Sequence, residues 1–407
     1  MAADAVSLDE RARRRALNAL LVYTFFMVAG FTMVMPLVAV HFVDRIGLTA
    51  AAIGAALAVR QITQQGLAVF GGALADRIGN RPMIVAGVLL RALGFAALGL
   101  ATNMPTLFVA MLVSALGGAL FEAPYQAAIA SLTTDANRAR YYSISNTISG
   151  IATTGGPLLG VALLRFDFRI VCLAAAACFA LNAVVALLLP RLPVPAEAPR
   201  LAQGFQLVLR NRPFVLLTLI MMGYWFVSVQ INITFPLLVV RLTGSEDGIG
   251  VMFALSAAMT ILLQYPAMRW LERRLATEQI LIVGVILMAV GMSVIAFVDS
   301  FPAFLVAVAV FSFGTLLTRP TQQTITAGLA DRNALGTFLG FNSLAMAVGG
   351  GIGNFLGGWM FDIAGRIATP MLPWLVFASV ALFTGLALRA LLPREMPAAS
   401  VSGTSGG

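Results

Sequence analysis

The segment Gly71–Pro82, with the sequence GGALADRIGNRP, brings three charged side chains together in a chain of which only 11% is charged. Apolar windows at residues 50–72 and 82–102 flank it, and each window is long enough to cross a bilayer as a helix. We therefore interpret the segment as a short polar loop between two membrane-spanning helices. Its glycines permit a tight turn and a close approach of helices, and its charges suit a membrane surface.

The composition of the whole chain is that of a membrane protein. Hydrophobic residues make up 60% of its 407 residues, too many for a soluble chain to cover with polar surface. We predict an all-α membrane protein with twelve transmembrane helices, at residues 17–42, 50–72, 82–102, 105–132, 141–164, 168–190, 214–240, 248–270, 278–298, 302–329, 336–361 and 371–392. A second span follows the first window directly, so we expect the first to be retained as a helix.

The distribution of arginine predicts the orientation of the chain. The sequence contains no lysine, so all 26 basic residues are arginine. If the amino terminus is cytoplasmic, eighteen arginines of loops and tails lie on the cytoplasmic side and five on the other. By the positive-inside rule we expect both termini of this multi-pass membrane protein in the cytoplasm. The net charge of +9 then needs only membrane lipids as its partner and no nucleic acid.

A shift of 196 residues aligns the first half of the chain with the second. The aligned pairs include Arg45 with Arg241, Gly54 with Gly250, Asp76 with Glu272, Arg77 with Arg273, Pro124 with Pro320 and Gln126 with Gln322. Both members of each pair fall in corresponding windows or loops, which indicates that six spans were duplicated. We predict an N-terminal half at 1–190, a cytoplasmic connector at 191–213, a C-terminal half at 214–393 and a flexible tail at 394–407.

The polar loop and the duplication together carry a resemblance to a known family. The stretch Gly72–Arg81 resembles the loop signature of the major facilitator superfamily, with Asn80 where a basic residue is common. The stretch GPLLG at 156–160 resembles the core of a motif associated with antiporters in that superfamily. The stretches 60–91 and 166–169 are similar to the MdtH-type bacterial multidrug-resistance transporters. The resemblance implies the major facilitator fold, a multi-pass location in the inner membrane of a bacterium, and efflux of drug-like molecules driven by the proton gradient.

The resemblance also assigns roles to individual residues of these motifs. A conformational switch is expected of the loop residues Gly72, Asp76, Arg77, Gly79 and Arg81. The antiporter-like motif contributes Gly156, Pro157 and Gly160. We expect Asp76, Arg77 and Arg81 to latch the second span to its neighbours in one transport state.

The energy source can be narrowed from the residues themselves. A phosphate-binding P-loop needs its lysine, and the chain has none, which leaves coupling to an ion gradient. Proton coupling requires an ionisable side chain inside the membrane. Sixteen of the seventeen acidic residues lie in tails, loops or span ends, and only Glu122 lies deep, in the fourth window. Glu122 is either a proton carrier or a structural acid that neutralises Arg91 or anchors the polar loop.

Three arginines accompany Glu122 at membrane depth, namely Arg60, Arg91 and Arg319. A charge at this depth is costly unless it is paired or hydrated, so we expect structural pairing or the lining of a wet cavity. The family resemblance places substrate contacts on the first, fourth, seventh and tenth spans. The candidates there are aromatic or amide side chains: Tyr23, Phe26, Tyr125, Gln126, Tyr224, Trp225, Gln230, Asn232 and Gln322. Helix packing is the alternative role for each of them.

These observations favour a secondary active transporter that exports small amphipathic or drug-like molecules by alternating access. A transporter of one metabolite or nutrient on the same fold is the alternative, and a non-transporting membrane protein is a third possibility. The chain lacks a His, Cys and Asp cluster and a nucleophile–base pair, so we expect no enzyme activity, no catalytic residue, no metal and no cofactor. The expected partners are a small-molecule substrate, protons and membrane lipids, and we expect a monomer.

Overall fold

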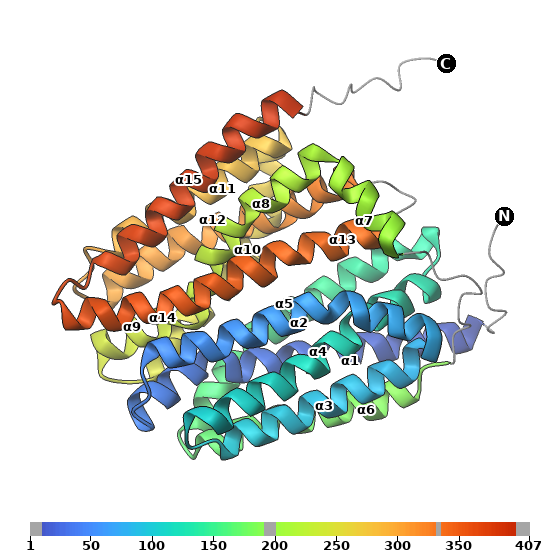
Figure 1. Ribbon diagram of the computed structural model, residues 1–407, viewed down its shortest axis with the longest axis horizontal. Coiled ribbons are helices and arrows are strands. Elements are labelled where there is room, and N and C mark those ends of the chain that lie inside the picture. The colour runs from blue at the N-terminus through green and yellow to red at the C-terminus, as the bar shows by residue number, and fades with distance from the viewer. Residues whose placement is uncertain (1–9, 191–200, 331–334, 396–407) are drawn as a thin grey trace.

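The computed structural model describes residues 10–190, 201–330 and 335–395, and every regular element in these ranges is a helix (Figure 1). The described part of the N-terminal half contains six long helices. They are α1 (Glu10–Val40), continued by the π-helical turn η1 (His41–Arg45), α2 (Ala50–Ile78), α3 (Asn80–Leu100), α4 (Met104–Leu132), α5 (Asp135–Leu164) and α6 (Phe168–Leu187).

The described part of the C-terminal half also forms six spans, two of which are broken. The first is α8 (Arg212–Ser228), joined through the 3₁₀ turn η2 (Val229–Asn232) to α9 (Thr234–Thr243). It is followed by α10 (Asp247–Glu272), α11 (Thr277–Ile295) and α12 (Phe301–Leu329), then by α13 (Leu335–Leu344), η4 (Ala345–Gly349) and α14 (Gly350–Arg366), and by α15 (Leu372–Glu395). A further short helix, α7 (Leu201–Arg210), lies in the expected connector.

Eleven helices in the described ranges are long and apolar enough to cross a membrane. The one predicted span that is not among them is α2, which carries Arg60, Gln61, Gln64 and Gln65 in its middle third. At 29 residues α2 is as long as α4, and it packs against α4 and α14. Each predicted window therefore corresponds to one helix or one broken helix, and the predicted twelve-helix fold of two six-helix repeats is confirmed.

The polar loop that suggested this fold is a one-residue turn. Helix α2 ends at Ile78 and α3 begins at Asn80, and Gly79 between them has a φ of 99°, a conformation that side chains other than glycine rarely adopt. At Gly71 an added Cβ would collide with the backbone carbonyl of Ala119 on α4. The expected tight turn and close helix approach are therefore both present.

Helix α1 begins and α15 ends at the same end of the bundle, and we refer to the opposite end as the far face (Figure 1). The far face carries η1 and the turns after α5, α9 and α14. Two ion pairs join the halves there, since Arg45 Nε lies 3.4 Å from Glu246 Oε1 and Arg165 Nη2 lies 3.1 Å from Asp247 Oδ1.

A carboxylate from one half also caps a helix of the other half at the far face. The backbone N–H of Ala50 donates to Asp362 Oδ1 at 3.1 Å, and that of Ala51 donates to Asp362 Oδ2 at 2.7 Å. The first N–H groups of a helix have no partner within the helix, and the helix dipole favours an anion at this end. Asp362 of α14 thus stabilises the N-terminus of α2 only while the two halves are together.

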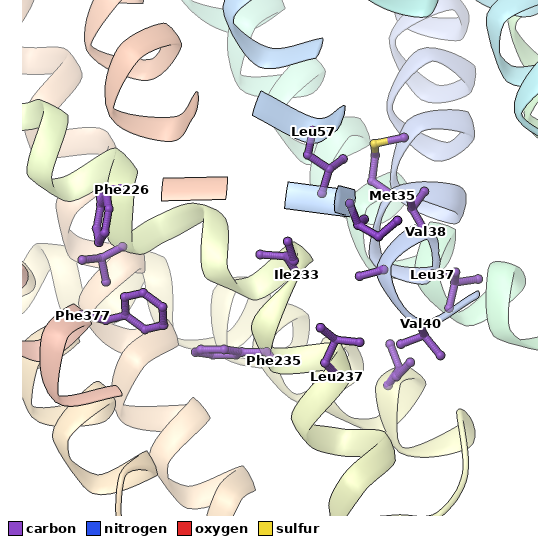
Figure 2. Packing of buried hydrophobic residues seen from close by; sticks show 14 of the residues in the cluster. Met35, Leu37, Val38, Val40, Leu57, Phe226, Ile233, Phe235, Leu237 and Phe377 are labelled. Atoms are coloured by element: carbon purple, nitrogen blue, oxygen red, sulfur yellow. The ribbon is translucent and has the colours of Figure 1, made fainter. Parts of the chain in front are cut away.

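Apolar packing closes the same end of the molecule. Figure 2 shows Leu37 and Val40, at the end of α1, beside Leu237 of α9, and all three belong to one buried hydrophobic cluster. Each of these side chains is at most 3% exposed. The far face is therefore sealed between the halves by both apolar and polar contacts.

Candidate functional site

The structure brings three of the four predicted intramembrane charges together. Arg60 projects from α2, Arg91 from α3 and Glu122 from α4, in the part of the N-terminal half where α2 and α3 both pack against α4. Arg60 is 7% exposed and Arg91 is 3% exposed, whereas Glu122 is half-buried. The two guanidinium groups are thus almost completely removed from solvent, and the carboxylate is partly accessible.

The side chain that connects these charges is Gln64 of α2. Its Oε1 accepts hydrogen bonds from Arg60 Nη1 at 3.1 Å and from Arg91 Nη1 at 3.4 Å. Its Nε2 donates to Glu122 Oε2 at 3.2 Å. Within the described residues, no ion pair of 4 Å or less joins Glu122 to either arginine. The amide therefore lies between the opposite charges and links them without a direct ion pair.

Aromatic rings surround the two guanidinium groups. The Cζ atom of Arg60 lies 5.1 Å from the centre of the Phe31 ring, and that of Arg91 lies 5.0 Å from the same ring. Arg91 Cζ also lies 5.3 Å from the ring centres of both Phe121 and Phe179. A ring face attracts a cation, most strongly when both are removed from water. These rings offset part of the cost of burying two positive charges in the membrane.

A glycine of α4 makes room for the network. A Cβ added at Gly118 would lie 2.6 Å from Gln64 Cδ and 2.8 Å from Arg91 Nη1. Any side chain at this position would displace the amide or the guanidinium group. The network is therefore held by the packing of α4 against its neighbours as well as by hydrogen bonds.

Two of the predicted substrate-cavity residues lie together near Glu122. The rings of Tyr23 and Tyr125 stack with their centres 4.9 Å apart, and Tyr125 Oη is 2.6 Å from Thr24 Oγ1. Tyr23 is buried and Tyr125 is half-buried, one helical turn after Glu122. Gln126, the next residue, is exposed. Phe26 is also half-buried, but no stacking contact links it to the tyrosine pair.

Three of the predicted cavity residues of the C-terminal half lie at the end of α8 and in the turn η2 that follows it. Tyr224 is buried and meets Trp225 edge to face with ring centres 5.1 Å apart. Gln230 is fully buried, and its Nε2 donates to the carbonyls of Phe226 at 3.0 Å and Gly353 at 2.8 Å. Gln230, at the break between α8 and α9, therefore links α8 to α14 through these two carbonyls.

The remaining predicted residues of that half lie apart from the charge network. Asn232 is half-buried in η2, and Gln322 is 4% exposed on α12. Arg319, also on α12, is exposed and makes no hydrogen bond or ion pair to another described residue.

The glycines of the two sequence motifs lie at helix contacts or at a turn. In the loop motif, Gly72 lies close to Ala123 of α4 and Gly79 forms the turn, while Arg77 is exposed and Arg81 is half-buried. The side chain of Asp76 lies outside the described part of the structure.

The antiporter-like motif brings α5 close to α1. An added Cβ at Gly156 would collide with Thr32 Oγ1, and one at Gly160 with the carbonyl of Met33. Pro157 between them is buried. Thr32 Oγ1 also donates across the contact to the carbonyl of Ala152 at 3.3 Å. These residues set the distance between two helices of the N-terminal half.

Sequence reasoning did not identify Gln64 as a functional residue. A signal was present, because Gln64 stands four residues after Arg60 and therefore on the same helix face, in the polar middle third of α2. An amide inside a membrane span needs hydrogen-bond partners as much as a charge does.

The family comparisons agree with this geometry. The sequence profile of the Major Facilitator Superfamily matches residues 20–242 and 220–407. The chain is 37% identical over 390 residues to multidrug resistance protein MdtH of Sodalis glossinidius (strain morsitans), covering 95% of this chain and 96% of that protein. It is also 37% identical over 400 residues to multidrug resistance protein MdtH of Photorhabdus laumondii subsp. laumondii, covering 98% of this chain and 100% of that protein.

Solved structures share the fold at much lower sequence identity. A POT family transporter in complex with 5-aminolevulinic acid matches with a TM-score of 0.81 at 15% identity, covering 94% of this chain and 97% of that chain. A bacterial homolog of the human lysosomal transporter Spinster, solved in an inward-facing and unoccupied conformation, matches with a TM-score of 0.77 at 17% identity, covering 97% and 100%. The profile match over most of the sequence, together with the identity to full-length relatives, shows that this chain belongs to the Major Facilitator Superfamily and is a multi-pass membrane transporter rather than an enzyme.

Proposed function

We propose that this protein is a proton-coupled exporter of small amphipathic or drug-like molecules in the inner membrane of a bacterium. The substrate class is supported by the relatives, since full-length proteins 37% identical to this chain are multidrug resistance proteins. One chain supplies both six-helix halves. We therefore expect it to act as a monomer surrounded by membrane lipids.

Transport by alternating access is supported by the contacts between the halves. The ion pairs, the Asp362 cap and the apolar cluster all join the halves at the far face. The excess of arginine in the terminal tails and the loops on their side of the bundle favours a cytoplasmic location for that side, which makes the far face periplasmic. In this orientation the protein is closed towards the periplasm, as in an inward-facing transporter. Export then requires these contacts to break and re-form in each cycle.

Proton coupling is supported by one observation above all, the environment of Glu122. It is a half-buried carboxylate ten residues before the end of α4, which is about 15 Å along the helix axis from that end. A carboxylate in a direct buried ion pair stays ionised, because its protonation would leave the positive charge of its partner buried and unpaired. Glu122 instead contacts an amide, with two guanidinium charges behind it. Such a group can take up a proton from the periplasm and release it to the cytoplasm.

The stacked Tyr23–Tyr125 pair and the exposed Gln126 support a substrate path beside Glu122. An aromatic surface with amide groups binds amphipathic molecules of varied shape. Asp76, Arg77 and Arg81 act as a latch where α2 turns into α3, at the end of the bundle opposite the far face. In this account Asp76→Asn slows transport and leaves substrate binding unchanged.

The experiment is efflux of a fluorescent amphipathic dye from proteoliposomes under an imposed pH gradient, with and without a protonophore. Wild-type protein should expel the dye only while the gradient lasts. Glu122→Gln removes the ionisable group at nearly constant shape, and it should abolish gradient-driven efflux while dye-for-dye exchange continues. Glu278→Gln makes the same chemical change in the first turn of α11, outside the network, and is the matched control.

The outcomes separate the proposal from its alternative. Gradient-driven efflux by a well-expressed Glu122→Gln protein at the wild-type rate contradicts proton coupling through this residue. Failure to transport any dye of a broad panel, together with transport of a single nutrient, favours a transporter of one metabolite on the same fold.

A further inference from the structure

The amide of Gln64 occupies a position in which only one of its two orientations is compatible with its neighbours. Two guanidinium groups, which only donate hydrogen bonds, face its Oε1, and the Oε2 atom of Glu122, which accepts a hydrogen bond, faces its Nε2. Reversal of the amide would place donor against donor and acceptor against acceptor. The amide dipole is therefore fixed, with its positive end towards Glu122 and its negative end towards the arginines.

From this geometry we infer that Gln64 is the positioning residue through which the protonation state of Glu122 is transmitted to α2 and onward to the contact between the two halves. The inference rests on the proposed role of Glu122 as the proton carrier. It adds a second residue, on another helix, that acts through Glu122 and does not itself exchange the transported proton.

The connection from Gln64 to the other half consists of contacts along α2. Arg60 donates from Nη1 to Gln64 and from Nη2 to Gln61 Oε1, at 3.1 Å in both cases. Gln61 is 3% exposed, and an added Cβ at Gly350 of α14 would lie 3.5 Å from its Cγ. A movement of the Gln64 amide therefore reaches the α2–α14 interface through Arg60 and Gln61.

Protonation of Glu122 changes the strength of the hydrogen bond from Gln64 Nε2 to Glu122, which is the first contact in this series. While Glu122 is ionised, the bond from Gln64 Nε2 is charge-assisted. Once the carboxylate is protonated, the bond becomes a neutral one, about half as strong. The bond between the Gln64 amide and Glu122 of α4 then weakens, while Arg60 and Arg91 continue to donate to Gln64 Oε1. Glu122 thereby controls how firmly α2 is bound within its own half.

The test is the pH profile of gradient-driven dye efflux in Gln64→Met. Methionine matches glutamine in length and fills the same space, but it cannot donate to the carboxylate. Loss of a hydrogen bond to a charged group makes the ionised form less stable, so the midpoint of the profile should rise by about one to two pH units. Gln65→Met is the matched control, because Gln65 is also buried on α2 but makes no hydrogen bond to a described residue.

A second measurement does not depend on transport. In pH-difference infrared spectra of the protein in lipid, the carboxylic C=O band that is missing from Glu122→Gln belongs to Glu122. Gln64→Met should move this band to higher frequency, because the carbonyl loses its hydrogen-bond donor. An added Cβ at Gly118 would crowd both the Gln64 amide and Arg91 Nη1, so Gly118→Ala disturbs the position of the amide without removing it. It should shift the efflux midpoint in the same direction, so the test stands even if Gln64→Met fails to insert.

An unchanged or lowered midpoint in Gln64→Met, an infrared band at the wild-type position, or an equal shift in Gln65→Met would each overturn the role of Gln64. If these results occur while Glu122→Gln still loses gradient-driven efflux, the proposed function stands and only the inference about Gln64 fails. If Glu122→Gln keeps full efflux, the proposed function fails with it.

Discussion

The cap that Asp362 places on α2 predicts a specific effect on the closure of the far face. Asp362→Ala removes two charge-assisted hydrogen bonds, at 3.1 and 2.7 Å, that exist only while α14 of one half touches α2 of the other. Loss of a capping side chain costs about 0.5–2 kcal/mol. Loss of an anion at a helix N-terminus costs about 0.3–1 kcal/mol more. The closed state should therefore lose about 1–3 kcal/mol, which is about a 5–150-fold change in the closed-to-open ratio.

The assay is the reaction rate of a cysteine that the closed far face protects. Leu237 is 3% exposed in the apolar cluster at the far face. The variant Leu237→Cys is made in a background without the native cysteines Cys172 and Cys178. Its thiol should react with a membrane-impermeant maleimide only when the halves separate. Asp362→Ala should raise this rate about 5–150-fold. Asp299→Ala removes an exposed carboxylate near the same face and should leave the rate unchanged. A rate in Asp362→Ala within twofold of its parent would refute the reasoning.

Two further substitutions test the helix contacts around the site. Gln230→Leu removes the two hydrogen bonds that Gln230 Nε2 donates to the carbonyls of Phe226 and Gly353, so it should cost about 1–3 kcal/mol and lower the melting temperature of the purified protein. Gly160→Val forces α5 away from the Met33 carbonyl, which should cost about 1–3 kcal/mol in the same thermal assay. Gly155→Ala, where an added Cβ meets nothing within 4 Å, should not lower the melting temperature, and equal losses in the two glycine variants would contradict the packing role of Gly160.

The sequence predicts the spans and the tight turn because these features depend on local properties. A run of apolar residues is sufficient to indicate a membrane helix, and the glycine in the polar loop is sufficient to permit a turn with a positive φ at Gly79. The helix α7 within the connector was not predicted, since ten residues with mixed polarity give no membrane signal.

The arrangement of the charge network could not be predicted in the same way. The positions of Glu122, Arg60, Arg91 and Arg319 within the apolar windows predict that these residues lie at membrane depth, but they do not indicate which of them meet. The structure places the first three around Gln64 and leaves Arg319 exposed on the other half. This grouping depends on how α2, α3 and α4 pack, which involves residues up to 62 positions apart in the chain.

The central claim, that protons move through this protein by way of Glu122, is tested most directly by measuring the protons themselves. A pH-sensitive dye inside proteoliposomes reports the change in internal pH when a gradient of a transported substrate is imposed in the absence of a pH gradient. The account predicts a substrate-dependent pH change with wild-type protein and none with Glu122→Gln, although the variant still exchanges labelled for unlabelled substrate. Proton movement by Glu122→Gln at the wild-type rate, or substrate export by wild-type protein with no proton movement, would contradict it.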